Sequence, residues 1–113
     1  MKYLCIPADV VMVDPAGQPT GETVSFATFI RNVILNHSRW GETPARLRQS
    51  VAVQAAIDPV AVGSHAHLED GWHELLLACA EHPAAPYQPH AFRQLIPFFD
   101  AIESASSERP EKG

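Results

Sequence analysis

The chain has 113 residues, of which 46% are hydrophobic and 19% charged, and its formal net charge is −5. This length suits one globular domain, and the composition excludes a disordered chain or a coiled coil. The acidic balance argues against a broad nucleic-acid-binding surface, because such a surface needs an excess of Lys and Arg.

The cysteines and the apolar runs indicate a reduced, cytoplasmic protein. Cys5 and Cys79 each lie in an apolar run, where a free thiol behaves as a small hydrophobic group. The first apolar run is interrupted by Pro7 and Asp9 and is too short for a signal peptide. No run approaches the ~20 apolar residues of a membrane helix. We therefore expect no membrane segment.

The first elements in chain order are a hairpin and a helix. Residues 10–13 are rich in β-branched side chains, residues 14–21 are rich in turn formers, and Thr23 and Val24 resume the strand pattern. This order predicts an N-terminal β-hairpin with a long tip. Ser25 can then cap a helix over about residues 26–37, whose apolar side chains share one face.

Proline positions mark the next helix. Thr43 followed by Pro44 is a typical helix start, and Pro59 requires the helix to end before it. The apolar side chains of this helix recur at intervals of four residues, so we expect them on its buried face. They are Leu47, Val51 and Ala55, with Ala52 beside them.

The second half of the chain predicts two further helical segments. Residues 60–67 have no helical period and form either an extended connector or a short strand. A helix follows from about Asp70 to the residue before Pro83. A last helix begins at Pro89, and Pro97 should kink or break it after Ile96. We expect Phe29, Trp72, Leu76 and Phe99 to be buried.

These patterns together define a fold class. We expect one globular domain over residues 1–104 and a flexible tail over residues 105–113, because the chain becomes polar from Ser104 onward. The class is mainly α, with an N-terminal β-hairpin followed by about four short helices, a helix-dominated α+β arrangement.

The histidines give the strongest spacing for a metal site. His65-x-His67 in an extended segment places both rings on one side, and His73 lies one turn into the next helix. No Cys-x-x-Cys or His-Glu-x-x-His motif completes the set. We expect three polar surface residues and no metal or other cofactor.

Catalytic groups are sparse elsewhere. Cys79 would be a nucleophile only beside a base, and its position in a helix indicates core packing. No nucleophile elbow, phosphate loop or dinucleotide fingerprint occurs. We expect no enzymatic activity. The alternative is a small metal- or thiol-dependent enzyme built on His65, His67 and His73 together with Cys79.

Positive charge is concentrated in residues 31–48, which carry a net charge of +3 while the rest of the chain carries −8. The commoner interpretation of such a segment is a solvated helix face, and the functional interpretation is a docking surface for an acidic partner. Trp40 is either an exposed interface anchor among these arginines or a cover for the core edge. The charged residues of this segment are Arg31, Arg39, Glu42, Arg46 and Arg48.

The order of several local motifs carries a resemblance. The chain has an extended start, a Val-rich segment followed by Asp14-Pro15, and Val24-Ser25-Phe26 at a helix entrance. Asp70-x-Trp72 and Leu95-x-Pro97-Phe98 follow. This layout resembles small accessory proteins of tailed-bacteriophage structural modules. The resemblance implies a partner in virion assembly and carries over no site residue, because these are turn and packing features.

We therefore expect a non-enzymatic protein-interaction module. Its partner would be an acidic protein, or a second copy joined through the hairpin edge, since a hairpin of short strands leaves backbone groups unpaired. The expected surface combines that edge with Trp40 and the four arginines. A nucleic-acid-binding regulator using residues 39–48 is a further alternative, which the net charge opposes.

Overall fold

The structure, a computed structural model, describes residues 1–83 and 85–108. Its strands are β1 (Lys2–Cys5), β2 (Val10–Val13), β3 (Pro19–Val24) and β4 (His65–Leu68). Its α-helices are α1 (Phe26–Phe29), α2 (Pro44–Ile57), α3 (Asp70–Glu81), α4 (Pro89–Arg93) and α5 (Ile96–Glu103). The fold is helix-dominated α+β, as the sequence predicts.

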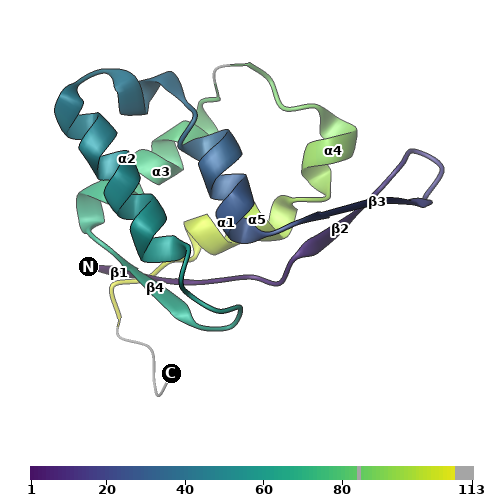
Figure 1. Cartoon of the computed structure of the whole chain (residues 1–113), viewed down its shortest axis with the longest axis horizontal. Coiled ribbons are helices and arrows are strands. Elements are labelled where there is room, and N and C mark those ends of the chain that lie inside the picture. Colours follow the sequence, from purple (N-terminus) through teal and green to yellow (C-terminus); the bar gives the residue numbers. More distant parts are fainter. Residues whose placement is uncertain (84, 109–113) are drawn as a thin grey trace.

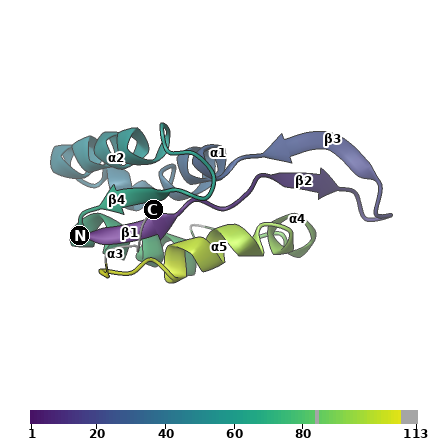
Figure 2. The ribbon, with the colours of Figure 1, turned by 90° about the horizontal axis from the view of Figure 1, so that it is seen from below.

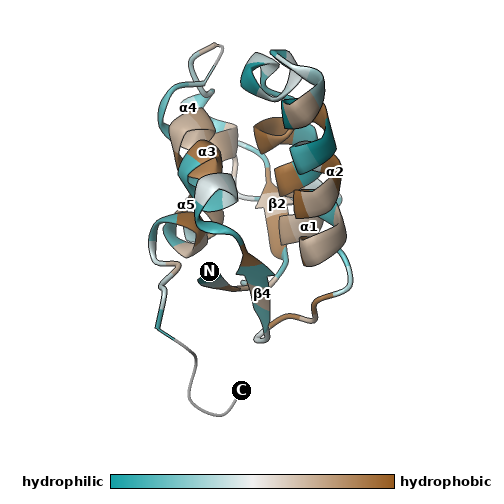
Figure 3. Cartoon of the chain, turned by 90° about the vertical axis from the view of Figure 1, so that its left-hand side faces the viewer, coloured by the Kyte–Doolittle hydropathy of each residue, from teal (hydrophilic) through white to brown (hydrophobic). Residues whose placement is uncertain are grey.

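The helices form two layers. α1 and α2 lie on one side of the strands, and α3, α4 and α5 lie on the other (Figure 2). Figure 3 shows the same two groups of helices from another side. The molecule measures 41 × 37 × 20 Å along its principal axes. Figure 1 looks down the shortest of these axes, so the two layers are separated along it.

The predicted hairpin is confirmed. β2 pairs antiparallel with β3, with Val10 opposite Val24 and Val13 opposite Pro19. At the tip, the Asp14 carboxylate accepts hydrogen bonds from two backbone amides at 2.9 Å, and Gly17 adopts a φ of 85°. Glycine adopts this left-handed conformation without the steric cost that a Cβ imposes. The tip of the hairpin extends beyond the helices at the end of the molecule where α4 lies (Figure 1).

A second sheet was not predicted. β1 pairs antiparallel with β4, with Tyr3 opposite His67 and Leu4 opposite Ala66. The segment over residues 60–67, for which the sequence left two interpretations, therefore ends in a strand. Its pairing partner lies about 60 residues earlier in the chain, so no local turn signal announces the pair.

The chain also pairs with β1 beyond α5. Tyr3 and Ser106 exchange backbone hydrogen bonds of 2.8 and 3.2 Å. The sequence predicts a flexible tail from residue 105, whereas this pairing attaches the backbone to the domain as far as Ser106. Residues 109–113 of the predicted tail lie outside the described residues.

The predicted helix over residues 26–37 is divided. Ser25 caps α1 by accepting a hydrogen bond from the Thr28 amide at 3.2 Å, as expected. The chain then widens into a π-helical turn (Ile30–Ile34), with the Leu35 amide bonded to the Ile30 carbonyl at 2.8 Å. A 3-10 turn (Ser38–Gly41) follows. The predicted apolar face is nevertheless largely buried, because Phe26, Phe29, Ile30 and Ile34 are each 1% exposed.

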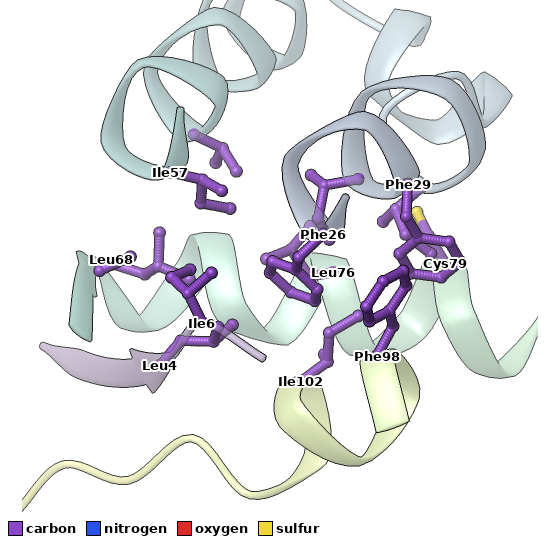
Figure 4. Close-up of a cluster of buried hydrophobic side chains, with 14 of the residues drawn as sticks. Leu4, Ile6, Phe26, Phe29, Ile57, Leu68, Leu76, Cys79, Phe98 and Ile102 are labelled. Carbon is purple, nitrogen blue, oxygen red and sulfur yellow. The ribbon is translucent and has the colours of Figure 1, made fainter. Parts of the chain in front are cut away.

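The core lies between the two layers (Figure 4). The Phe98 ring of α5 lies 5.5 Å from the Phe26 ring and 5.2 Å from the Phe29 ring, measured between ring centroids. Phe98 is fully buried, whereas Phe99 and Trp72, which the sequence predicts to be in the core, are only half-buried.

Among the helices of the described residues, none has both the length and the apolar composition that crossing a membrane requires.

Candidate functional site

Trp40 belongs to the core, so its predicted role as an exposed anchor is wrong. Its side chain is 1% exposed. The 3-10 turn (Ser38–Gly41) reverses the chain before α2 and places the indole inside the fold. The indole Nε1 has no hydrogen-bond partner in the part of the chain that the structure describes. The neighbouring residue Arg39 is half-buried.

The predicted combined surface of arginines and hairpin does not form. Arg31 and Arg48 are exposed, while Arg46 is half-buried and lies 3.5 Å from Glu42 in an ion pair. Arg46 and Arg48 lie on α2, and the hairpin tip lies at the opposite end of the molecule from this helix (Figure 1). The hairpin edge and the basic segment are therefore separate surfaces.

Part of the hairpin edge is already occupied. The Val13 amide donates to Gln94 Oε1 at 2.9 Å, and the Val13 carbonyl accepts from Gln94 Nε2 at 3.2 Å and from His90 Nε2 at 3.0 Å. These side chains replace the backbone of a further strand at this end of β2. The outer side of β3 remains exposed from Pro19 to Thr23.

The three histidines of the candidate metal site are not brought together. His65 and His67 lie on β4, where the His67 ring packs edge-on against the Tyr3 ring with centroids 4.9 Å apart. His73 is 5% exposed and bonds through Nε2 to the Ile102 carbonyl at 2.7 Å. The described residues contain no group of three or more side chains that could hold a metal ion.

The surroundings of Cys79 do not provide a thiolate and a base. Cys79 is 1% exposed, and burial raises the pKa of its thiol, while the nearby Arg39 guanidinium lowers it to a smaller extent. Cys79 and His37 both line a cavity of about 320 Å³. The His37 Nδ1 accepts a hydrogen bond from the Arg39 amide at 3.1 Å, and the His37 Nε2 donates one to the His82 carbonyl at 2.8 Å. Both ring nitrogens are therefore engaged in structural bonds.

The outward face of α2 is apolar. The sequence predicts that Leu47, Val51 and Ala55 form the buried face of this helix, and that prediction is wrong. Leu47 is 53% exposed and Val51 is 69% exposed, and Ala55 is also exposed. The buried face carries Val53 and Ile57 instead. Both sets recur at four-residue intervals, so the periodicity identifies two apolar stripes without indicating which one faces the core. We call Leu47, Val51 and Ala55 the α2 stripe.

A groove on the other layer was not predicted. A cavity of about 360 Å³ lies between α3 and α5 and is bounded at one end by α4. Tyr87 forms an aromatic wall, with its ring centroid 4.6 Å from that of Phe92 and 5.2 Å from that of Phe99. Its hydroxyl donates to the Ala80 carbonyl at 3.1 Å, which fixes the ring. We call this cavity the α3–α5 groove.

The rim of the α3–α5 groove is charged and partly apolar. Ile96 lines it and is 51% exposed. Glu81, Glu103 and Arg93 also line it, and all three are exposed and form no ion pair with one another. Ile96, Phe99 and Glu103 recur at helical spacing, which is the sequence signal that could have indicated this face of α5.

Comparison of the chain with models of protein families, with curated proteins and with solved structures finds no match.

Proposed function

We propose that this chain is a non-enzymatic protein-interaction module that docks a partner on the α2 stripe. The observation that carries the proposal is the exposure of Leu47 and Val51 on the outward face of a helix whose inward face is also apolar. A helix that is apolar on two faces is typically covered on both. The second cover would come from another protein chain.

The charge beside the α2 stripe favours an acidic partner. Arg48 is exposed next to Leu47 and has no ion-pair partner among the described residues. An apolar centre with a charged rim is the usual arrangement of a protein interface. Complementary charge would mainly set the orientation and the association rate of such a partner.

The arrangement of nucleophilic and basic groups favours binding over catalysis. The thiol of Cys79 is buried and has a raised pKa, and His37 and His73 use ring nitrogens in bonds to backbone groups. A role in virion assembly, implied by the layout that resembles phage accessory proteins, is consistent with a chain that acts through contacts with other chains. We propose that role as the biological setting.

Site-specific photocrosslinking tests the α2 stripe. A photoreactive phenylalanine analogue at Val51 should give adducts with a partner protein when the chain is expressed in its native source. The matched control is the same analogue at Gln49, which is exposed on the same helix but about 160° around its axis. Adducts from both positions, or from neither, would contradict the proposal.

A further inference from the structure

The partner of the α2 stripe can be inferred from the opposite face of the same molecule. We propose that the α2 stripe of one copy docks into the α3–α5 groove of a second copy, so that copies associate head to tail. This inference rests on the proposed function, because it names the partner of that same surface.

The two layers carry opposite charges. Four arginines and one glutamate give residues 26–57, which include α1 and α2, a net charge of +3. Five acidic residues and one arginine give residues 70–103, which include α3, α4 and α5, a net charge of −4. The charge asymmetry of the sequence is therefore a polarity across the shortest axis of the molecule (Figure 2). Two copies attract when unlike layers face each other.

The apolar parts of the two surfaces are complementary in kind. The α2 stripe presents aliphatic side chains from one helix, and the α3–α5 groove presents Ile96 and Phe99 from α5 and Leu77 from α3. A helix ridge that enters the groove between two helices is a common packing mode. Contact would cover Val51 and Ile96, which are among the most exposed large hydrophobic side chains of the described residues.

The charged residues at the edges of the two surfaces also correspond. Arg48 flanks the α2 stripe, and Glu81 and Glu103 line the α3–α5 groove. Arg93 lines the groove as well and would repel Arg48. Glu81, Arg93 and Glu103 together give the groove a net charge of −1. The attraction should weaken with salt, because the Debye length falls from about 10 Å at 0.1 M to about 3 Å at 1 M ionic strength.

The position of the two surfaces determines the type of assembly. They lie on opposite layers, so a copy that has docked its α2 stripe still presents a free groove (Figure 2). A contact between two different surfaces is heterologous, and it extends into a chain of copies or closes into a ring. A symmetric dimer through α2 alone would instead leave the groove unused.

Two blocking variants test this arrangement by sedimentation velocity. Val51→Glu places a carboxylate that would enter an acidic groove, and Ile96→Lys places an ammonium group that would face Arg48. The wild-type chain should increase in mass with concentration, and each variant alone should remain monomeric. An equimolar mixture should form a heterodimer of twice the mass of one chain and nothing larger, because each partner retains one intact surface.

The controls separate this inference from the proposed function. Gln49→Glu makes the same charge change as Val51→Glu outside the stripe and should associate like wild type. Both blocked positions are exposed, and formation of the heterodimer itself requires both variants to be folded. A monomeric wild type at millimolar concentration, or a mixture that remains monomeric, would overturn head-to-tail association. If Val51 then crosslinks to a different protein, the proposed function still holds.

Discussion

His73 Nε2 donates a hydrogen bond to the Ile102 carbonyl at 2.7 Å, which joins the first turn of α3 to the end of α5 inside the core. This bond explains why His73 does not accompany His65 and His67 at the surface. A histidine one turn into a helix after a His-x-His pair suggests a third metal ligand. In α3, however, the His73 side chain lies on the face of the helix that packs against the core.

Replacing His73 with Phe should lower the free energy of unfolding by about 1–3 kcal/mol, because the ring volume is kept while the buried Ile102 carbonyl loses its donor. Chemical denaturation measures this difference. The control is His82→Gln, at the exposed C-terminal end of α3, which should change the free energy by less than about 0.5 kcal/mol. Equal effects of the two substitutions would show that the bond does not stabilise the fold.

Phe98 should contribute far more to stability than its neighbour Phe99. Phe98→Ala should cost about 3–5 kcal/mol, because it removes a fully buried ring that packs on Phe26 and Phe29. Phe99→Ala should cost less, because Phe99 is half-buried at the α3–α5 groove. Denaturant midpoints of the two variants provide the test, and a larger loss for Phe99→Ala would contradict the packing described.

The comparison of these two residues shows how far the sequence determines the fold. The predicted segments for the hairpin, for α2 and for α3 are confirmed, because turn formers, caps and prolines act locally. The break expected after Ile96 is wrong in position: the helix is interrupted between Arg93 and Ile96, and α5 runs from Ile96 through Pro97, which lies in its first turn. That shift of the helix start rotates the inward face from Phe99 to Phe98.

The candidate surfaces were harder to predict than the elements. Which stripe of α2 faces the core depends on β4 and the 3-10 turn that pack against it, and these are tertiary contacts. The β1–β4 pairing and the α3–α5 groove likewise join segments far apart in the chain. The arginines and the charge asymmetry were visible in the sequence, but their distribution over two layers was not.

Trp40 should behave as a core residue with an unused polar atom. Trp40→Ala should cost about 3–5 kcal/mol, as truncation of a large buried aromatic side chain does. Trp40→Phe should cost much less, because it removes an indole N–H that has no partner within the described residues and keeps one aromatic ring. Thermal and chemical unfolding measure both. An unchanged stability for Trp40→Ala would restore its role as a surface anchor.

The two thiols should differ in reactivity by their burial. Cys5 is exposed on β1, whereas Cys79 is 1% exposed and burial raises the pKa of its thiol. Since the thiolate is the reactive form, iodoacetamide at pH 8 should alkylate the native chain once, at Cys5, and the denatured chain twice. Intact mass and peptide mapping identify the modified residues, and the Cys5→Ser variant should remain unmodified until it unfolds.

The raised pKa of the Cys79 thiol also determines how the free energy of unfolding changes with pH. The pKa of Cys79 is higher in the folded chain than the value of about 8.5 expected after unfolding, so the folded chain retains its proton more strongly. Its contribution to stability is complete below about pH 8.5 and is lost as the pH rises through the folded-state pKa. Cys79→Ala should therefore flatten the fall in stability above that pH, measured by chemical denaturation from pH 7 to 10. Alkylation of native Cys79 as fast as Cys5 would contradict both expectations and would favour the thiol-dependent alternative.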